Sequence, residues 1–132
     1  MPVTDYVLIS FRPDLQLLIM RWTRVATPAE HRAGYEAALR LARAEQAGCW
    51  LIDLRSRGLA DPTDLLWVLH DFRAELQATL SAAMRRIAYF TTPYHADTLA
   101  ARLRELNADA SDSLEIRVFV EEAPAYAWLG AG

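Results

Sequence analysis

The chain has 132 residues, of which 53% are hydrophobic and 23% charged, a composition typical of one folded domain. Its formal net charge of −3 indicates no excess of positive surface charge of the kind that binds nucleic acid or an anionic membrane. All 14 basic residues are arginine, which excludes reactions that depend on a Schiff-base or phosphate-binding lysine.

Cysteine usage and hydrophobic runs set the expected compartment. Cys49 is the only cysteine, so no internal disulfide forms, and no apolar run reaches the roughly 18 residues that a membrane span requires. We therefore expect a cytoplasmic protein without membrane insertion. Residues 1–132 are predicted to form a single domain because no linker or low-complexity segment divides them.

The N-terminal third predicts a β-hairpin followed by a helix. Two β-rich runs, residues 6–11 and 15–22, are separated by a turn that contains Pro13. Thr27, Pro28 and Glu30 then form a helix start with Thr27 as N-cap. The helix is expected to extend to about Gln46, and small residues on one face indicate close packing against a sheet.

The middle of the chain predicts a buried strand at residues 49–54 and a second helix that starts with Asp61 as N-cap. The core stripe of this helix is expected to consist of five residues at helical spacing: Leu65, Leu69, Phe72, Leu76 and Leu80. At about 100° per residue, Trp67 and His70 fall on the opposite side. Trp67 therefore either lies against a neighbouring loop or the terminal helix, or marks a contact patch, and we favour a homodimer contact through Trp67 and His70.

The last third predicts a strand at residues 86–91, a helix from about His95 to Asn107, a strand at 114–120 and a short helix at 122–129. Strands that alternate with helices indicate a layered α/β domain. The expected fold is α/β, with a mixed sheet of about five strands, an N-terminal β-hairpin and about four helices.

Two segments carry a resemblance to a known family: Trp50-Leu51-Ile52-Asp53, and residues 119–129, FVEEAPAYAWL. With the order of elements, they resemble the STAS-like fold of sulfate-transporter and anti-sigma-factor-antagonist domains, particularly the small stand-alone bacterial members. Signalling members of that family have Asp-Ser-Ser-Gly at the start of a helix, and a partner kinase phosphorylates one serine. The resemblance therefore implies a regulatory protein-interaction module.

The phosphorylation motif is altered in this chain. Laid on it without gaps, the motif places its Asp at Asp61, its serines at Pro62 and Thr63, and its Gly at Asp64. Because Asp64 would repel a transferred phosphate, we expect the phospho-switch to be lost. Thr63 and Ser56 are the two candidate phosphosites, although an ordinary place in a turn or first helical turn accounts for both.

The segment from Asp53 to Thr63 is the predicted binding loop for a partner or ligand. Its candidate residues are Asp53, Arg55, Ser56, Arg57, Asp61 and Thr63. Asp53 is the foremost candidate because ligands of open α/β sheets gather at the carboxyl ends of strands. The structural alternatives are a hydrogen bond from the loop to Asp53 and N-capping by Asp61.

The favoured function is therefore a non-catalytic interaction or regulatory module that needs no cofactor and binds a protein partner or itself. A first alternative is a domain that binds a small apolar ligand or a lipid in a closed cavity. A second is an enzyme of unknown class, which would require a cleft near Asp53, Arg55 and Ser56 with a strongly perturbed carboxylate. His31, His70 and His95 fall on three different helices, so no metal site is expected.

Overall fold

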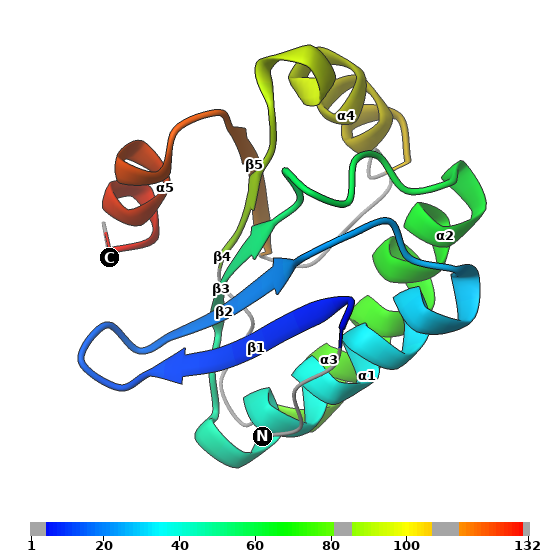
Figure 1. Ribbon diagram of the computed structural model, residues 1–132. Helices are drawn as coiled ribbons and strands as arrows, with labels where there is room; N and C mark the ends of the chain where they lie inside the picture. Colours follow the sequence, from blue (N-terminus) through cyan, green and yellow to red (C-terminus); the bar gives the residue numbers. More distant parts are fainter. Residues whose placement is uncertain (1–4, 81–85, 107–113, 131–132) are drawn as a thin grey trace.

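The computed structural model describes residues 5–80, 86–106 and 114–130, and a five-stranded mixed sheet lies at its centre (Figure 1). The strands are adjacent in sequence order: β1 (Val7–Arg12), β2 (Leu17–Trp22), β3 (Cys49–Asp53), β4 (Arg86–Phe90) and β5 (Glu115–Phe119). β1 is antiparallel to β2, and the other neighbours are parallel. The predicted α/β fold with a mixed sheet and an N-terminal hairpin is confirmed.

Four helical segments follow the strands within the described residues. They are α1 (Pro28–Glu45); α2 (Pro62–Trp67), which continues through the π-helical turn η1 (Val68–Phe72) into α3 (Arg73–Thr79); α4 (Pro93–Leu106); and α5 (Glu122–Leu129). α1 to α4 lie on one face of the sheet and α5 lies on the other (Figure 1). This arrangement is expected where each parallel strand is joined to the next by a crossover of the usual right hand. α4 begins at Pro93, two residues earlier than predicted, because proline is tolerated at the first helical position. The predicted helix end at Asn107 lies outside the described residues.

Hydrophobic clusters lie on both faces of the sheet. The larger cluster joins Trp22, Trp50 and Tyr89 to the inner sides of α1 to α4. The smaller cluster joins Leu51 and Phe90 to α5. Both faces of β3 are therefore covered, which explains its uninterrupted apolar sequence.

The hairpin turn is longer than predicted. Residues 13–16 form the turn, and Leu15, which was assigned to the second strand, is 47% exposed. The amide of Leu15 donates to Arg12 O at 3.2 Å and that of Gln16 donates to Pro13 O at 3.3 Å. These turn hydrogen bonds hold both amides away from the strand ladder, so β2 begins at Leu17.

The second helical segment has the predicted core stripe, and all five of its residues are buried. Trp67 differs from the prediction, because it is half-buried and packs against α1, with its ring 6.3 Å from that of Tyr35. The reason is the η1 turn, which adds a residue to the helical repeat. Trp67 and Phe72, five residues apart, are thereby brought to a ring separation of 5.9 Å. His70 is exposed, as predicted.

Candidate functional site

The predicted binding loop follows β3 at the edge of the sheet where the parallel strands end, and its side chains separate onto the two faces of the sheet. Asp53 and Arg55 belong to the α5 side, where they meet Arg21 of β2 and Phe90 of β4. Arg57 lies on the opposite side, over the ring of Trp22. The structure therefore does not bring the six predicted residues into one cluster.

Asp53 is the centre of an ion-pair network on the α5 side. Its carboxylate accepts from Arg21 Nη1 at 2.8 Å and from Arg55 Nη2 at 2.9 Å. Arg21 also donates through Nη2 to Glu122 at 2.6 Å, which ties α5 to the sheet. Asp53 Oδ1 further accepts from the backbone amide of Arg55 at 3.1 Å. The hydrogen bond to the loop that we considered as the structural alternative is therefore present.

The surroundings of Asp53 keep it ionised. Burial opposes ionisation, but the hydrogen bonds from Arg55 and Arg21 outweigh burial and hold the pKa of Asp53 below its ordinary value. The guanidinium carbon of Arg55 lies 4.2 Å from the centre of the Phe90 ring. A carboxylate that serves as a general acid needs a raised pKa, so the geometry at Asp53 gives no support to the enzyme hypothesis.

Arg57 turns inward on the helical side and is 8% exposed. The amides of Arg57 and Gly58 both donate to Leu54 O, which closes a tight turn, and Gly58 has a φ of 80°. This positive φ favours glycine. The turn places the guanidinium of Arg57 with its carbon 5.1 Å from the centre of the Trp22 ring.

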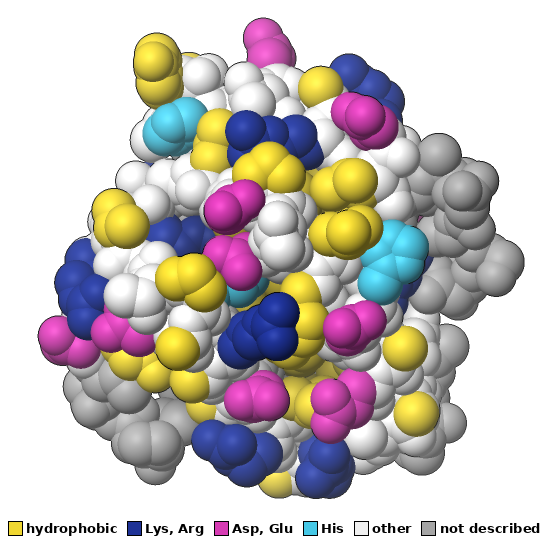
Figure 2. Space-filling model, turned by 90° about the vertical axis from the view of Figure 1, so that its right-hand side faces the viewer, with side chains coloured by type: hydrophobic (Ala, Val, Ile, Leu, Met, Phe, Trp, Pro, Cys, Tyr) yellow, Lys and Arg dark blue, Asp and Glu magenta, His cyan; other side chains and the backbone are white. Residues whose placement is uncertain are grey.

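An open pocket of about 250 Å³ lies beside Arg57, between the loop after β2 and the loop after β3. One wall comes from the first of these loops and the start of α1, and the other from residues 59–64; the lining residues are Val25, Ala26, Pro28, His31, Arg57, Leu59, Ala60, Asp61 and Asp64. Figure 2 shows the side of the molecule formed by α1 and α2, where charged side chains of both signs lie among hydrophobic ones. Sequence reasoning did not predict this pocket, because its walls are far apart in the chain.

His31 is buried behind this pocket and stacks on Trp22, with a ring separation of 5.7 Å. Burial, together with the positive charges of Arg57 and Arg32, lowers the pKa of His31 to about 3. The imidazole is therefore neutral at physiological pH.

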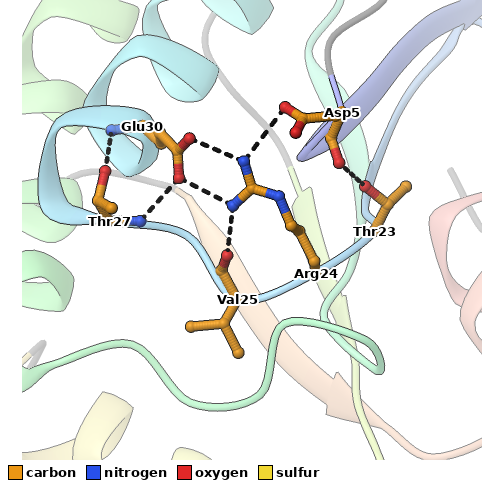
Figure 3. Close-up of polar contacts among 6 residues, drawn as sticks. All are labelled: Asp5, Thr23, Arg24, Val25, Thr27 and Glu30. Carbon is orange, nitrogen blue, oxygen red and sulfur yellow. Dashed lines mark hydrogen bonds and ion pairs between the residues drawn. The ribbon is translucent and has the colours of Figure 1, made fainter.

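The loop after β2 is fixed by Arg24 (Figure 3). Arg24 Nη2 lies 2.8 Å from Glu30 Oε2 and 3.1 Å from Asp5 Oδ1, and Nη1 donates to Val25 O at 2.7 Å. Glu30 also completes the predicted capping box with Thr27. The side chain of Val25 points away from the Arg24 guanidinium (Figure 3), and it is 72% exposed. One wall of the pocket is thus held by several charge-assisted hydrogen bonds.

The start of α2 has the geometry expected from the sequence. Asp61 is the N-cap and accepts from the amide of Thr63 at 3.2 Å, as predicted. Ser56 and Thr63 are both exposed. Arg102 of α4 donates to Ala60 O at 3.0 Å and so attaches the loop to the neighbouring helix.

Exposed hydrophobic side chains surround this edge of the sheet. Val25 follows β2, Tyr94 lies at the start of α4 after β4 and is 87% exposed, and Val120 follows β5 and is 43% exposed. Leu8, 44% exposed, pairs with Arg21 at the same end of the sheet. Sequence reasoning missed these residues, because each is an isolated apolar side chain within a polar loop or an edge strand.

Residues 5–80, 86–106 and 114–130, which the structure describes, contain no metal-binding cluster and no membrane-spanning helix. No group of three His, Cys, Asp or Glu side chains there has the geometry to hold a metal ion. No helix in these ranges is long and apolar enough to cross a membrane.

An apolar pocket between α3 and the sheet, lined by Phe72, Leu76 and Tyr89 among others, has a volume of about 10 Å³. It is too small for a lipid, so it gives no support to the lipid-binding alternative.

Comparison with known proteins identifies the family. Residues 17–130 match the family model described as SpoIIAA-like, which covers most of the chain. Neither the search of curated proteins nor that of solved structures found a match. The chain belongs to the SpoIIAA-like family, whose fold is that of STAS and anti-sigma-factor-antagonist domains, so the resemblance seen in the sequence is confirmed.

Proposed function

We propose that this member of the SpoIIAA-like family is a non-catalytic regulatory module that docks a protein partner on the edge of the sheet where the parallel strands end. The observation that carries the proposal is the set of exposed apolar side chains at this end of the strands: Leu8, Val25, Tyr94 and Val120. Exposed apolar surface often marks an interaction site, and tyrosine is enriched among the residues that dominate the binding energy of protein interfaces.

The fixed position of the loop supports this proposal. Arg55 and Asp53 form ion pairs on one face, and Arg102 holds Ala60 on the other. A loop that is already ordered before binding loses little conformational entropy when it docks. Ser56 and Thr63 are exposed on this ordered loop and at the start of α2, where a partner would contact them.

The docking surface is tested by photo-crosslinking in the source cell. A photoreactive phenylalanine replaces Tyr94 in one variant and Leu15 in the other. Leu15 is the matched control, because it is an exposed hydrophobic residue on the hairpin turn, at the opposite end of β2. We expect a specific protein adduct, identified by mass spectrometry, from position 94 and none from position 15. Adducts from position 15 alone, or from neither position, would contradict the proposal.

We further propose that the phospho-switch of the family is lost in this chain. Thr63 is exposed, but Asp64 follows it and Asp61 precedes it, so a phosphate there would meet two carboxylates. We expect the intact mass of protein purified from its source to show no phosphate on Thr63 or Ser56. A stoichiometric phosphate on either residue would refute the loss.

We also propose that the module self-associates as a homodimer in the cytoplasm, through the exposed side of α2 and η1. Leu66 is 43% exposed and His70 is exposed on this side, with Trp67 half-buried beside them. We expect Leu66→Asp to halve the sedimentation mass, because a charge in an apolar interface must be desolvated. Ala101→Asp, at an exposed position on α4 away from this side, is the control for added charge. A wild-type protein that sediments as a monomer at high concentration would exclude the dimer.

A further inference from the structure

Arg57 is a buried cation without a carboxylate partner among the described residues. Its Nε donates to Gly58 O at 3.3 Å, while Nη1 is buried and has no acceptor. By contrast, Arg21, Arg24 and Arg55 all form ion pairs with carboxylates. A buried charge is costly unless it is paired, so an unpaired guanidinium at 8% exposure calls for a counter-ion.

His31 provides a second unsatisfied polar group in the same place. It is 3% exposed, and its Nδ1 has no hydrogen-bond partner in the part of the chain that the structure describes. Both His31 and Arg57 line the pocket of about 250 Å³ between the loops after β2 and β3. Two neighbouring polar groups that lack hydrogen-bond partners and line a pocket are typical of a ligand-binding site.

The other lining residues define the chemistry of that ligand. Val25, Pro28 and Leu59 provide apolar walls, and Asp61 and Asp64 add two carboxylates. A ligand in this pocket therefore meets a cation, an imidazole and two carboxylates. A dianion such as phosphate would be repelled by the two aspartates, whereas a molecule with separate positive and negative ends would complement both. Pockets for drug-sized ligands measure roughly 300–1,000 Å³, so this ligand is smaller.

We propose that this pocket binds a small zwitterion, an amino acid or a similar ammonium carboxylate, with its carboxylate on Arg57 and its ammonium group toward Asp61 and Asp64. Arg57 provides charge-assisted hydrogen bonds, and the neutral His31 adds a donor or acceptor. The apolar walls contact the aliphatic part of the ligand. This pocket adjoins the proposed protein-docking surface and shares Val25 with it, but its test does not depend on a partner.

The test is an NMR titration of the isotope-labelled chain with L-alanine at millimolar concentrations. We expect the Arg57 Nε–H resonance and the amides of residues 57–61 to shift in a saturable way, while the Arg55 Nε–H resonance stays constant. Acetate has only the carboxylate and ethylammonium has only the ammonium group. Each should therefore bind at least about ten-fold more weakly than L-alanine. Inorganic phosphate should not compete with L-alanine.

Two variants separate the site from a general loss of positive charge. Arg57→Gln is expected to abolish the shifts, whereas Arg40→Gln, at an exposed position of α1 outside the pocket lining, is expected to keep them. Asp64→Asn is a milder change that should weaken L-alanine binding and leave acetate binding unchanged, and it remains informative if Arg57→Gln does not fold. No saturable shift at Arg57 with L-alanine, unchanged binding by Asp64→Asn, or tighter binding of phosphate would overturn the proposal.

Discussion

His31 is buried in a neutral form, with one face stacked on the indole of Trp22. In the unfolded chain its pKa returns to an ordinary value near 6.5, well above the value of about 3 in the folded protein. The unfolded state therefore binds more protons as the pH falls below about 6.5, and protonation favours unfolding. Stability from this residue is fully present above pH 6.5 and is lost as the pH falls toward 3.

We expect the free energy of unfolding to fall by about 2 kcal/mol between pH 7.5 and pH 5, as measured by urea denaturation. Glu30 and Asp53 also have lowered pKa values, but their contributions are lost only at lower pH, below about 4.5. His31→Phe keeps an aromatic ring on Trp22 and should flatten this pH dependence. His70→Phe, at an exposed position, should not. A flat wild-type profile would show that His31 is not held neutral.

The two arginines of the binding loop show how neighbouring residues acquire different environments. The sequence predicts one binding loop that contains both Arg55 and Arg57. However, the turn at Gly58 buries Arg57 against Trp22, while Arg55 stays half-exposed over Phe90. Their positions depend on aromatic residues from other strands, which a reading of the loop alone does not place.

At the scale of elements, α1 packs closely against β2 because Gly34 faces the ring of Trp22. A methyl group added at Gly34 would lie 2.7 Å from Trp22 Cη2. The ring cannot easily move, because His31, Tyr35 and Arg57 all contact it. The small residue predicted on the packed face of this helix is thus required for the helix to approach the sheet.

We expect Gly34→Ala to destabilise the protein by about 1 kcal/mol. Overpacking typically costs about 1–3 kcal/mol, and the better helix propensity of alanine returns up to about 1 kcal/mol. The measurement is the urea midpoint at constant m-value. In a Trp22→Leu background the same change should be neutral or stabilising, since the clash is absent. Equal destabilisation in both backgrounds would mean that Trp22 is not the obstacle.

The elements themselves were predictable from local signals. Thr27 and Asp61 cap their helices as expected, and the periodic leucines after Asp61 are buried. The prediction put Trp67 on the side opposite the core stripe. It was wrong because the π-helical turn changes the helical repeat, and no residue pattern predicts such a turn. The pocket and the ion-pair network were not predictable, because they join residues such as Arg21 and Glu122 that are distant in sequence.

At the scale of the whole molecule, the helices that connect the parallel strands all lie on the same face of the sheet, so the two faces differ. α1 to α4 cover one face and α5 alone covers part of the other, so the loops that follow β2 to β5 meet at one edge (Figure 1). The order of the described strands, β1-β2-β3-β4-β5, contains no reversal, so the sheet has no topological switch point of the kind where ligands of open α/β sheets usually bind. The edge therefore presents a continuous row of loops, which suits contact with a protein surface.

The central claim is that this edge docks a protein partner. The most direct measurement is the affinity of the partner identified by crosslinking for the wild-type chain, for Tyr94→Asp and for Leu15→Asp, by isothermal titration calorimetry. Both positions are exposed, so both variants should fold. We expect Tyr94→Asp to weaken binding by about 2 kcal/mol, a factor near thirty, and Leu15→Asp to bind as the wild type does. Equal binding by the wild type and Tyr94→Asp, with weakened binding by Leu15→Asp, would contradict the claim and place the interface at the hairpin.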